Sequence, residues 1–365
     1  MISIVIISIL ITHTVIVGRW LKDFIRLSLK NRGYSSSEGE NLRIEPLTVV
    51  IACKNEALRL PNLIEALEKQ IKAAEEIIIV DDNSRDSTLD VAKKLAKSKS
   101  VKISVILNKG KGKKAAIRTG VQQAHTKWII TTDADVICPD KWLESMGRTI
   151  SEYDDGNLGA IAGPVRILNG GIEAIDYSAM MGWAASSSIN GKTAIASAAN
   201  LAFRVDLYPD EEKMHPEIES GDDVFAVHAL IGAGNTVYWS HDINSCVDTQ
   251  KAGGVINWLR QRVRWGSKAK YYSHNYALQT SIWVAFLATT QIFILTLFIA
   301  GLSSLTELLV IWFGRSLIDI VFTRRVTKWY RIKTGVIDWL ILSIIYPIQV
   351  PVVFIFGLIS TPKWK

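Results

Sequence analysis

Cysteine is scarce in this chain of 365 residues, and its three copies lie far apart. Cys53, Cys138 and Cys246 match no metal-ligand spacing, which argues against a cysteine-based metal site. An odd number of isolated thiols also argues against a disulfide framework and indicates a reducing compartment.

A nucleic-acid reader motif with interleaved aromatic residues is also missing, although the formal net charge is +7 and the pI is about 9.1. Nucleic acid is therefore not an expected partner. The basic residues gather in four stretches, which a membrane surface and substrate phosphates explain better. These stretches are residues 19–32, 109–118, 251–270 and 324–333.

Charge is absent from residues 2–18 and from everything between Lys270 and Glu307. The first segment is just long enough to span a bilayer. It has neither a basic stretch in front nor a small-residue cleavage site behind, so we expect an uncleaved transmembrane helix over residues 1–18. Basic residues follow it, which predicts a cytoplasmic location for the next part of the chain.

Three more membrane helices or re-entrant segments are expected in residues 276–361. In the second of them, Arg315 and Asp319 stand four apart and can pair, so an ion-paired amphipathic segment is the alternative to a span. In the third, Pro347 and Pro351 favour a kinked helix or a re-entrant hairpin. The candidate segments are residues 277–300, 308–322 and 336–360.

Strand and helix patterns alternate between the membrane segments. After a basic and polar linker over residues 19–46, this alternation predicts one α/β domain over residues 47–250, with a mostly parallel sheet covered on both faces. We expect strands at residues 47–53, 76–80, 101–107, 127–132 and 158–165, and helices at 60–71, 87–96 and 115–124.

Residues 251–275 predict a basic amphipathic helix that lies in the membrane interface. Four apolar residues recur on one side, three arginines stand between them, and two tryptophans can anchor the helix. These are Val255, Ile256, Leu259 and Val263; Arg260, Arg262 and Arg264; and Trp258 and Trp265.

Asp133 and Asp135 stand one residue apart, directly after a predicted buried strand. In an open α/β sheet, ligands bind at this carboxyl edge. Two carboxylates there are hard oxygen ligands for Mg²⁺ or Mn²⁺, and a substrate diphosphate can complete the coordination shell. A polar loop that uses aspartate for turn chemistry is the alternative.

Further polar residues follow the neighbouring strands. A carboxylate of Asp81 or Asp82 can accept the N3–H of a uracil ring, or these acids and their neighbours can cap the next helix. Lys113 and Lys114 end a glycine–lysine stretch before a helix, which suits a diphosphate cradle or a solvated basic turn. The first strand is followed by a third cluster, Ala52 to Glu56.

Together these motifs, in this order and from Leu47 onward, resemble those of the membrane-embedded family 2 glycosyltransferases. This group holds the cellulose, hyaluronan, chitin and poly-N-acetylglucosamine synthases. The matching residues are Asp81 and Asp82; Asp133 and Asp135; Asn200, Phe203 and Arg204; Gly221, Asp222 and Asp223; and Gln261, Arg264 and Trp265.

The resemblance implies a Rossmann-like GT-A domain in the cytosol, with transmembrane helices at both ends, in a plasma or inner membrane. It implies inverting, β-forming and processive transfer from UDP-GlcNAc or UDP-Glc to a growing polysaccharide. A single transfer to a lipid, such as a polyprenyl phosphate or ceramide, is the first alternative. An inactive transport or scaffold component is the second. A homo-oligomer or an accessory export subunit is expected for a polymer product.

The resemblance also implies residue roles. Asp135 holds the Mg²⁺ or Mn²⁺ ion, Asp133 contacts the ribose and the metal shell, and Asp223 is the general base beside the like-charged Asp222. Trp265 stacks on the terminal sugar of the acceptor. The nucleotide-sugar set is Ala52, Lys54, Glu56, Asp81, Asp82, Lys113, Lys114, Asp133 and Arg264. The acceptor set is Asn200, Phe203, Arg204, Gln261 and Trp265.

Overall fold

The computed structural model describes residues 2–30 and 43–360, and the chain divides into two compact units. The first, here called the sheet unit, is formed by Leu27–Arg166 and Ser187–Gln250. The second, the helical unit, is formed by Met1–Arg26, Ile167–Ser186 and Lys251–Pro362. Residues 31–42 of the predicted basic and polar linker lie outside the described residues.

A seven-stranded sheet in the order β3-β2-β1-β4-β7-β5-β8 is the centre of the sheet unit. All its strand pairs are parallel except those that β7 makes with β4 and β5. The predicted mostly parallel α/β fold is therefore confirmed. The strands of this sheet are β1 (Leu47–Cys53), β2 (Glu76–Asp81), β3 (Ile103–Leu107), β4 (Trp128–Thr132), β5 (Leu158–Ala162), β7 (Leu201–Arg204) and β8 (Thr236–Trp239). A separate two-stranded sheet pairs β6 (Val165–Ile167) with β9 (Val247–Thr249).

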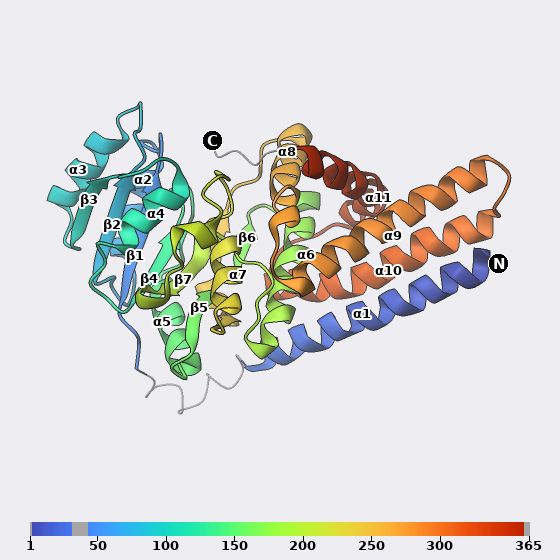
Figure 1. Cartoon of the computed structure of the whole chain (residues 1–365), viewed down its shortest axis with the longest axis horizontal. Helices are drawn as coiled ribbons and strands as arrows, with labels where there is room; N and C mark the ends of the chain where they lie inside the picture. Colours follow the sequence, from blue (N-terminus) through green and yellow to red (C-terminus); the bar gives the residue numbers. More distant parts are fainter. Residues whose placement is uncertain (1, 31–42, 361–365) are drawn as a thin grey trace. The chain divides into compact units, whose positions relative to one another are not determined.

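Helices cover the central strands of this sheet, which carry mostly apolar residues. Every residue of β1, β2 and β4 is buried, as expected for strands covered on both faces. Helix α4 lies across β1 and β2 (Figure 1), with Gly120 against Val50 and Val80. The helices of this unit are α2 (Leu60–Glu68), α3 (Thr88–Ser98), α4 (Lys113–Val121), α5 (Trp142–Tyr153) and α7 (Val224–Gly232).

The strand order places a topological switch point between β1 and β4. From β1 the chain builds β2 and β3 on one side and then returns to add β4 on the other side. Ile51 of β1 lies opposite Thr132 of β4, so both strands end at the same edge. The crevice outside the carboxyl ends at such a point is where open α/β sheets bind ligands.

Long helices make up the helical unit, and three of them are long and apolar enough to cross a membrane. In Figure 1, α1, α9 and α10 run side by side. The three candidate spans are Ile2–Leu29, Asn275–Ile299 and Val336–Ile359. The helices of this unit are α1 (Ile2–Lys30), α6 (Gly171–Ser187), α8 (Val255–Gly266), α9 (Asn275–Ile299), α10 (Leu305–Trp329) and α11 (Val336–Ile359).

Several boundaries differ from those expected from the sequence. Helix α1 continues through the basic residues to Lys30, where a linker was expected, and α10 continues to Trp329 through part of the expected basic loop. Helix α11 is one continuous helix that contains Pro347 and Pro351, so it is not a re-entrant hairpin. Helix α6 groups with the long helices, although the sequence placed residues 171–187 in the sugar-transfer domain.

A polar network joins four of the long helices. Asp319 of α10 accepts from Arg315 at 2.7 Å and pairs with His13 of α1 at 2.9 Å. The Arg315 guanidinium also donates to Gln291 of α9 at 3.0 Å and lies 4.5 Å from the ring centroid of Tyr346 in α11. The pairing that the sequence suggested between Arg315 and Asp319 is present. Charges in an apolar bundle persist when they are paired in this way.

Candidate active site

The end of β2 carries two adjacent aspartates with different surroundings. Asp82 is 1% exposed, and its carboxylate accepts from Lys54 at 3.1 Å, Asn108 at 2.6 Å and the Gly112 amide at 3.0 Å. Gly112 has a φ of 85°, a conformation that favours glycine. Asp82 therefore holds three neighbouring loops together at the carboxyl edge of the sheet.

Asp81 keeps an acceptor atom for a ligand. Its Oδ2 accepts from the Ser84 amide at 3.1 Å, whereas its Oδ1 is buried and has no hydrogen-bond partner among the described residues. A buried acceptor without a partner is costly unless something donates to it. Of the two aspartates, Asp81 is therefore the better match to the predicted contact with a nucleotide base.

Lys113, the first residue of α4, joins the two downstream acidic motifs. Its ammonium lies 2.5 Å from Asp133 Oδ1 and 3.5 Å from Asp222 Oδ2, and its side chain is 12% exposed. Burial alone lowers the pKa of Lys113, but these carboxylates outweigh it and raise that pKa above its usual value. The structure thus places a permanent positive charge between the loop after β4 and the loop before α7.

Lys114 has a different environment from its neighbour. Its ammonium donates to the backbone carbonyls of Met214, His215 and Ile218 at 2.7, 2.9 and 2.7 Å. It also lies 4.7 Å from the ring centroid of Phe225. These contacts argue against the phosphate-binding role predicted for Lys114, because they already engage the ammonium in holding the loop before α7.

Four carboxylates face this part of the sheet edge from two loops. The Asp133 side chain is 36% exposed and Asp135 is half-buried, while Asp222 is 8% exposed. Asp223 is the N-cap of α7, and its Oδ1 accepts from the Val224 amide at 2.7 Å. The structure therefore brings the two acidic motifs together through Lys113.

Asp133 and Asp135 offer the oxygen ligands that Mg²⁺ and Mn²⁺ prefer. Within residues 2–30 and 43–360, no group of three acidic, histidine or cysteine side chains forms a metal cage. Two carboxylates nevertheless fit such an ion when substrate phosphates supply further ligands, as is common for Mg²⁺ in nucleotide enzymes.

The residues after β1 lie at the same edge but are engaged with the protein. Ala52 is 7% exposed within β1, and Lys54 donates to Asp82. The Glu56 carboxylate accepts from Arg59 at 3.0 Å. Of the predicted nucleotide-sugar set, these three are therefore packed against or bonded to other groups of the protein at this edge.

Asn200 and Phe203 are part of the core. Asn200 is 0% exposed; its amide donates to the carbonyls of Pro164 and Ser245, and its oxygen accepts from Trp142. Phe203 is 2% exposed within β7. This burial argues against the acceptor contacts predicted for both residues, and it assigns Asn200 to holding three backbone segments together.

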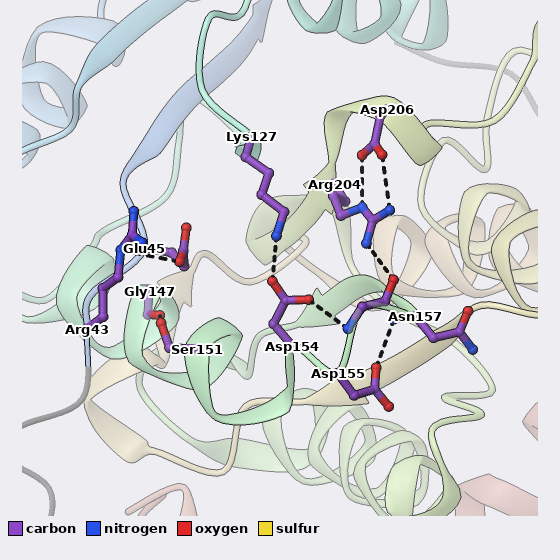
Figure 2. Close-up of polar contacts among 11 residues, drawn as sticks. Arg43, Glu45, Lys127, Gly147, Ser151, Asp154, Asp155, Asn157, Arg204 and Asp206 are labelled. Carbon is purple, nitrogen blue, oxygen red and sulfur yellow. Dashed lines mark hydrogen bonds and ion pairs between the residues drawn. The ribbon is translucent and has the colours of Figure 1, made fainter.

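Arg204 lies at the opposite edge of the sheet. It pairs in register with Trp128 at the start of β4, four residues before Thr132. Its guanidinium forms a fork with Asp206 at 2.8 and 3.0 Å and also donates to the Gly156 carbonyl (Figure 2). Strands rise about 3.3 Å per residue, so Arg204 is roughly 13 Å from the carboxyl edge and is not placed to bind the acceptor there.

Gln261, Arg264 and Trp265 belong to α8 in the helical unit. Trp265 and Tyr177 of α6 have ring centroids 5.6 Å apart, and both Arg264 and Gln261 are half-buried. The basic helix expected here is present, but its neighbour Arg262 is buried instead of facing lipid headgroups. The sequence analysis did not identify Tyr177 or predict the burial of Arg262. The spacing of Arg262, four residues after Trp258 and three before Trp265, is the sequence signal for that burial.

Comparison with known proteins decides the family. Residues 48–208 match the model of the family described as glycosyl transferase family 2. The chain carries a family 2 glycosyltransferase domain. Its predicted GT-A-like fold and its identity as a glycosyltransferase are confirmed.

The curated relatives of this glycosyltransferase are named for different transfer reactions. Glycosyltransferase AglE of Haloferax volcanii is 26% identical over 214 residues, which is 58% of this chain and 69% of the relative. A poly-beta-1,6-N-acetyl-D-glucosamine synthase of Staphylococcus epidermidis is 27% identical over 40% of this chain and 36% of the synthase. An undecaprenyl-phosphate 4-deoxy-4-formamido-L-arabinose transferase of Pseudomonas fluorescens is 35% identical over 31% of this chain and 34% of the transferase. The chain thus matches only about a third of the last two.

A solved structure shares the fold of this glycosyltransferase along its length. The mannosyltransferase PcManGT from Pyrobaculum calidifontis, solved with GDP-Man and Mn²⁺, superposes with a TM-score of 0.56 at 16% identity. The match covers 97% of this chain and 99% of the mannosyltransferase. At this identity the likeness shows the fold alone.

Proposed function

We propose that this family 2 enzyme transfers a sugar, with inversion, from a UDP-sugar to an acceptor held at the membrane. The observation that supports this most directly is the position of Lys113 between Asp133 and Asp222. It gathers charges from both acidic motifs at the switch point of the sheet, where a nucleotide diphosphate can bind.

The donor site in this proposal uses the groups at the carboxyl edge. Asp81 Oδ1 accepts the N3–H of uracil, and Lys113 and Arg264 add positive charge around the diphosphate. Asp133 and Asp135 hold Mg²⁺ or Mn²⁺. An ion held by these carboxylates would supply positive charge to offset that of the diphosphate.

Asp223 is the proposed general base. It takes the proton of the acceptor hydroxyl while that oxygen forms a bond to the anomeric carbon, and the bond from this carbon to the diphosphate oxygen breaks. Attack from the face opposite the leaving group gives the inverted, β-linked product. A positioned base of this kind typically contributes about 10²–10⁴-fold in rate. The Asp222 carboxylate lies 3.5 Å from the Lys113 ammonium, so its negative charge offsets part of the positive charge of that lysine.

A growing polysaccharide is the acceptor that the sequence motifs favour. In this reading, UDP-GlcNAc or UDP-Glc is the donor, and Gln261 and Trp265 hold the chain end for repeated addition. The similarity to a poly-beta-1,6-N-acetyl-D-glucosamine synthase supports it. A flat indole face suits the apolar face of a pyranose ring.

A lipid acceptor, such as a polyprenyl phosphate or ceramide, is favoured by the packing of the helical unit. The apolar cluster of Ile6, Ile294 and Ile311 lies between α1, α9 and α10, and Arg315 pairs with Asp319 and donates to Gln291 in the same bundle. A polymer would then leave through a homo-oligomer or an accessory export subunit, whereas a glycolipid needs no such path. The similarity to an undecaprenyl-phosphate sugar transferase supports this second candidate.

The enzyme is proposed to lie in a plasma or inner membrane with its sugar-transfer domain in the cytoplasm. Arg19, Lys22 and Arg26 on the C-terminal half of α1 support this orientation, because basic residues flank membrane helices on the cytoplasmic side.

Membranes that contain the protein test the proposal when they are incubated with labelled UDP-GlcNAc, UDP-Glc or GDP-Man, with Mg²⁺, Mn²⁺ or a chelator. Sizing the labelled product separates a polymer from a glycolipid. Transfer from GDP-Man alone would contradict the UDP-sugar assignment. An absence of product and of nucleotide release in every mixture would favour an inactive scaffold.

A further inference from the structure

The buried face of α8 is polar and aromatic, not aliphatic. Its members follow the spacing i, i+3, i+4 and i+7, which places them on one side of a helix. They are the buried Trp258 and Arg262 and the half-buried Gln261 and Trp265. The apolar pair Val255 and Ile256, which the sequence analysis expects at the membrane interface, is 59% and 67% exposed. The side of α8 turned to the protein therefore carries hydrogen-bonding and ring-stacking groups.

Arg262 is held by an ion pair with α6. Its Nη2 lies 2.6 Å from Asp176 Oδ2, and the two side chains are 8% and 10% exposed. The thioether of Met180, one turn along α6, lies 4.0 Å from the other terminal nitrogen of Arg262. A guanidinium that is desolvated and paired in this way has one orientation, because leaving either charge without its partner is costly.

The guanidinium in turn supports two aromatic rings. Its central carbon lies 4.6 Å from the ring centroid of Trp265 and 6.0 Å from that of Tyr177. The two rings are 5.6 Å apart and inclined by 45°. Cations attract aromatic faces at these distances, so the position of Arg262 restricts the planes of both rings.

The backbone beside Trp265 is also held in place. A Cβ atom at Gly357 of α11 would lie 3.1 Å from the carbonyl carbon of Gly266 and from the Ser267 nitrogen. The last turn of α8 therefore approaches α11 as closely as glycine permits. With the backbone fixed there, the side-chain neighbours of Trp265 set the orientation of its indole.

Several buried polar atoms on this face make no hydrogen bond within the described residues, and two of them beside Trp265 point to a ligand with hydroxyl groups. Gln261 Oε1 and Arg262 Nε are buried and have no hydrogen-bond partner within the described residues. One accepts and the other donates, and both lie within one helical turn of the Trp265 indole. Sugar hydroxyls can satisfy both, because each hydroxyl donates and accepts.

We infer that Asp176 and Arg262 are positioning residues that set the indole plane of Trp265, with Tyr177 as its second ring, and thereby the register of the acceptor sugar. This inference rests on the proposed role of Trp265 in binding the acceptor. It adds a second helix, α6, to the determinants of acceptor choice.

Kinetics of Asp176→Asn and of the neutral pair Asp176→Asn with Arg262→Gln test the inference. The single variant should raise the acceptor KM about 10-fold, with the donor KM and the rate of UDP release to water unchanged. The double variant restores a neutral hydrogen-bonded pair and should recover part of the acceptor affinity. Arg260→Gln, on the exposed side of the same helix, is the matched control. An equal loss in transfer and in UDP release would overturn the inference.

A second measurement does not depend on activity. In protein labelled with 5-fluorotryptophan, the ¹⁹F signal of Trp265 is the one that Trp265→Phe removes. Asp176→Asn should shift or broaden this signal, whereas Arg260→Gln should leave it in place. An unchanged Trp265 signal in folded Asp176→Asn protein would overturn the positioning role.

The two measurements also separate this inference from the proposed function. If wild-type protein transfers no sugar but the Trp265 signal responds to Asp176→Asn, the proposed function fails and the structural link between the ion pair and the ring stands. If transfer occurs and Trp265→Ala leaves the acceptor KM unchanged, the proposed acceptor role of Trp265 fails and the inference fails with it.

Discussion

At the scale of single residues, the site separates neighbours that look equivalent in the sequence. Asp81 and Asp82 are adjacent acids after one strand, yet Asp82 is enclosed by three protein donors and Asp81 keeps a buried oxygen without one. Lys113 and Lys114 divide in the same way between two carboxylates and three carbonyls. A sequence motif identifies such a pair but cannot tell which member faces the ligand, because that depends on partners far away along the chain.

Asp81→Asn should therefore impair UDP binding, whereas Asp82→Asn should impair the stability of the fold. Asp82→Asn should lower the free energy of unfolding by about 3 kcal/mol, because it removes the buried carboxylate that pairs with the half-buried Lys54. Asp81→Asn should leave the melting temperature without nucleotide nearly unchanged and weaken UDP binding about 10-fold. Thermal unfolding with and without UDP measures both effects. The opposite pattern, with Asp82→Asn stable and defective in UDP binding, would show that the assignment is reversed.

Asp223→Asn should separate chemistry from binding. Asparagine is as good an N-cap as aspartate, so α7 should keep its start and the protein its fold. The transfer rate should fall by about 10²–10⁴-fold, and UDP affinity should stay close to that of the wild type. Labelled-product assays and calorimetry with UDP check the two expectations. Glu211→Gln, an exposed acid close in sequence to the site, is the control, and sustained turnover by Asp223→Asn would remove Asp223 as the base.

At the scale of elements, the predictable and unpredictable parts of the fold have different physical origins. The apolar runs of β1, β2 and β4 and the helical stripe of α2 are local patterns, and burial follows them closely. The buried residues of α8 are Trp258 and Arg262, and the pairing of Arg262 with Asp176 of α6 holds that side of the helix against the protein. Ion pairs between elements can outweigh a short hydrophobic stripe, and a single sequence does not reveal them.

The ion pair of Arg204 with Asp206, at the amino edge of the sheet, should make the stability of the protein depend on pH. Arg204 lowers the pKa of Asp206 by hydrogen bonding, which ties the end of β7 to the following turn (Figure 2). A carboxylate with a lowered folded-state pKa contributes stability above its unfolded pKa of about 3.9 and loses it as the pH falls through the folded value.

Wild-type protein should therefore lose more stability than Arg204→Gln when the pH falls from 6 to 3. The two proteins should approach each other in melting temperature at the acid end, because the protonated Asp206 no longer attracts the guanidinium. Asp206 is mostly exposed, so the difference is expected to be small. Thermal melts over this pH range measure it, and parallel curves for the two proteins would rule out this contribution.

At the scale of the whole molecule, the sequence predicts the α/β domain and the membrane helices but not how the chain is shared between the two units. Helix α6 lies in the middle of the sugar-transfer region and yet belongs to the helical unit. Its residues lack a long apolar run, so nothing local distinguishes it from the helices of the sheet unit. The contact between His13 and Asp319, 306 positions apart, is equally invisible to local pattern.

The orientation in the membrane is the last prediction, and the native cysteines make it simple to test. Cys53, Cys138 and Cys246 are all buried, and burial raises the thiol pKa of Cys53 and Cys138, so they should react slowly with maleimides. A single exposed cysteine can then report its location without prior removal of the native ones. Lys109→Cys reports the sheet unit, and Leu302→Cys reports the turn between α9 and α10.

If basic flanks keep the sheet unit in the cytoplasm, a membrane-impermeant maleimide should label Leu302→Cys in intact cells and reach Lys109→Cys only after permeabilisation. The reason is that the candidate span α9 then crosses outward, so the turn that follows it lies outside. Unsubstituted protein gives the background, and labelling in detergent confirms that both cysteines are reactive. Labelling of Lys109→Cys in intact cells would place the sugar-transfer domain outside. The donor would then have to be an extracytoplasmic sugar carrier instead of a cytosolic nucleotide sugar.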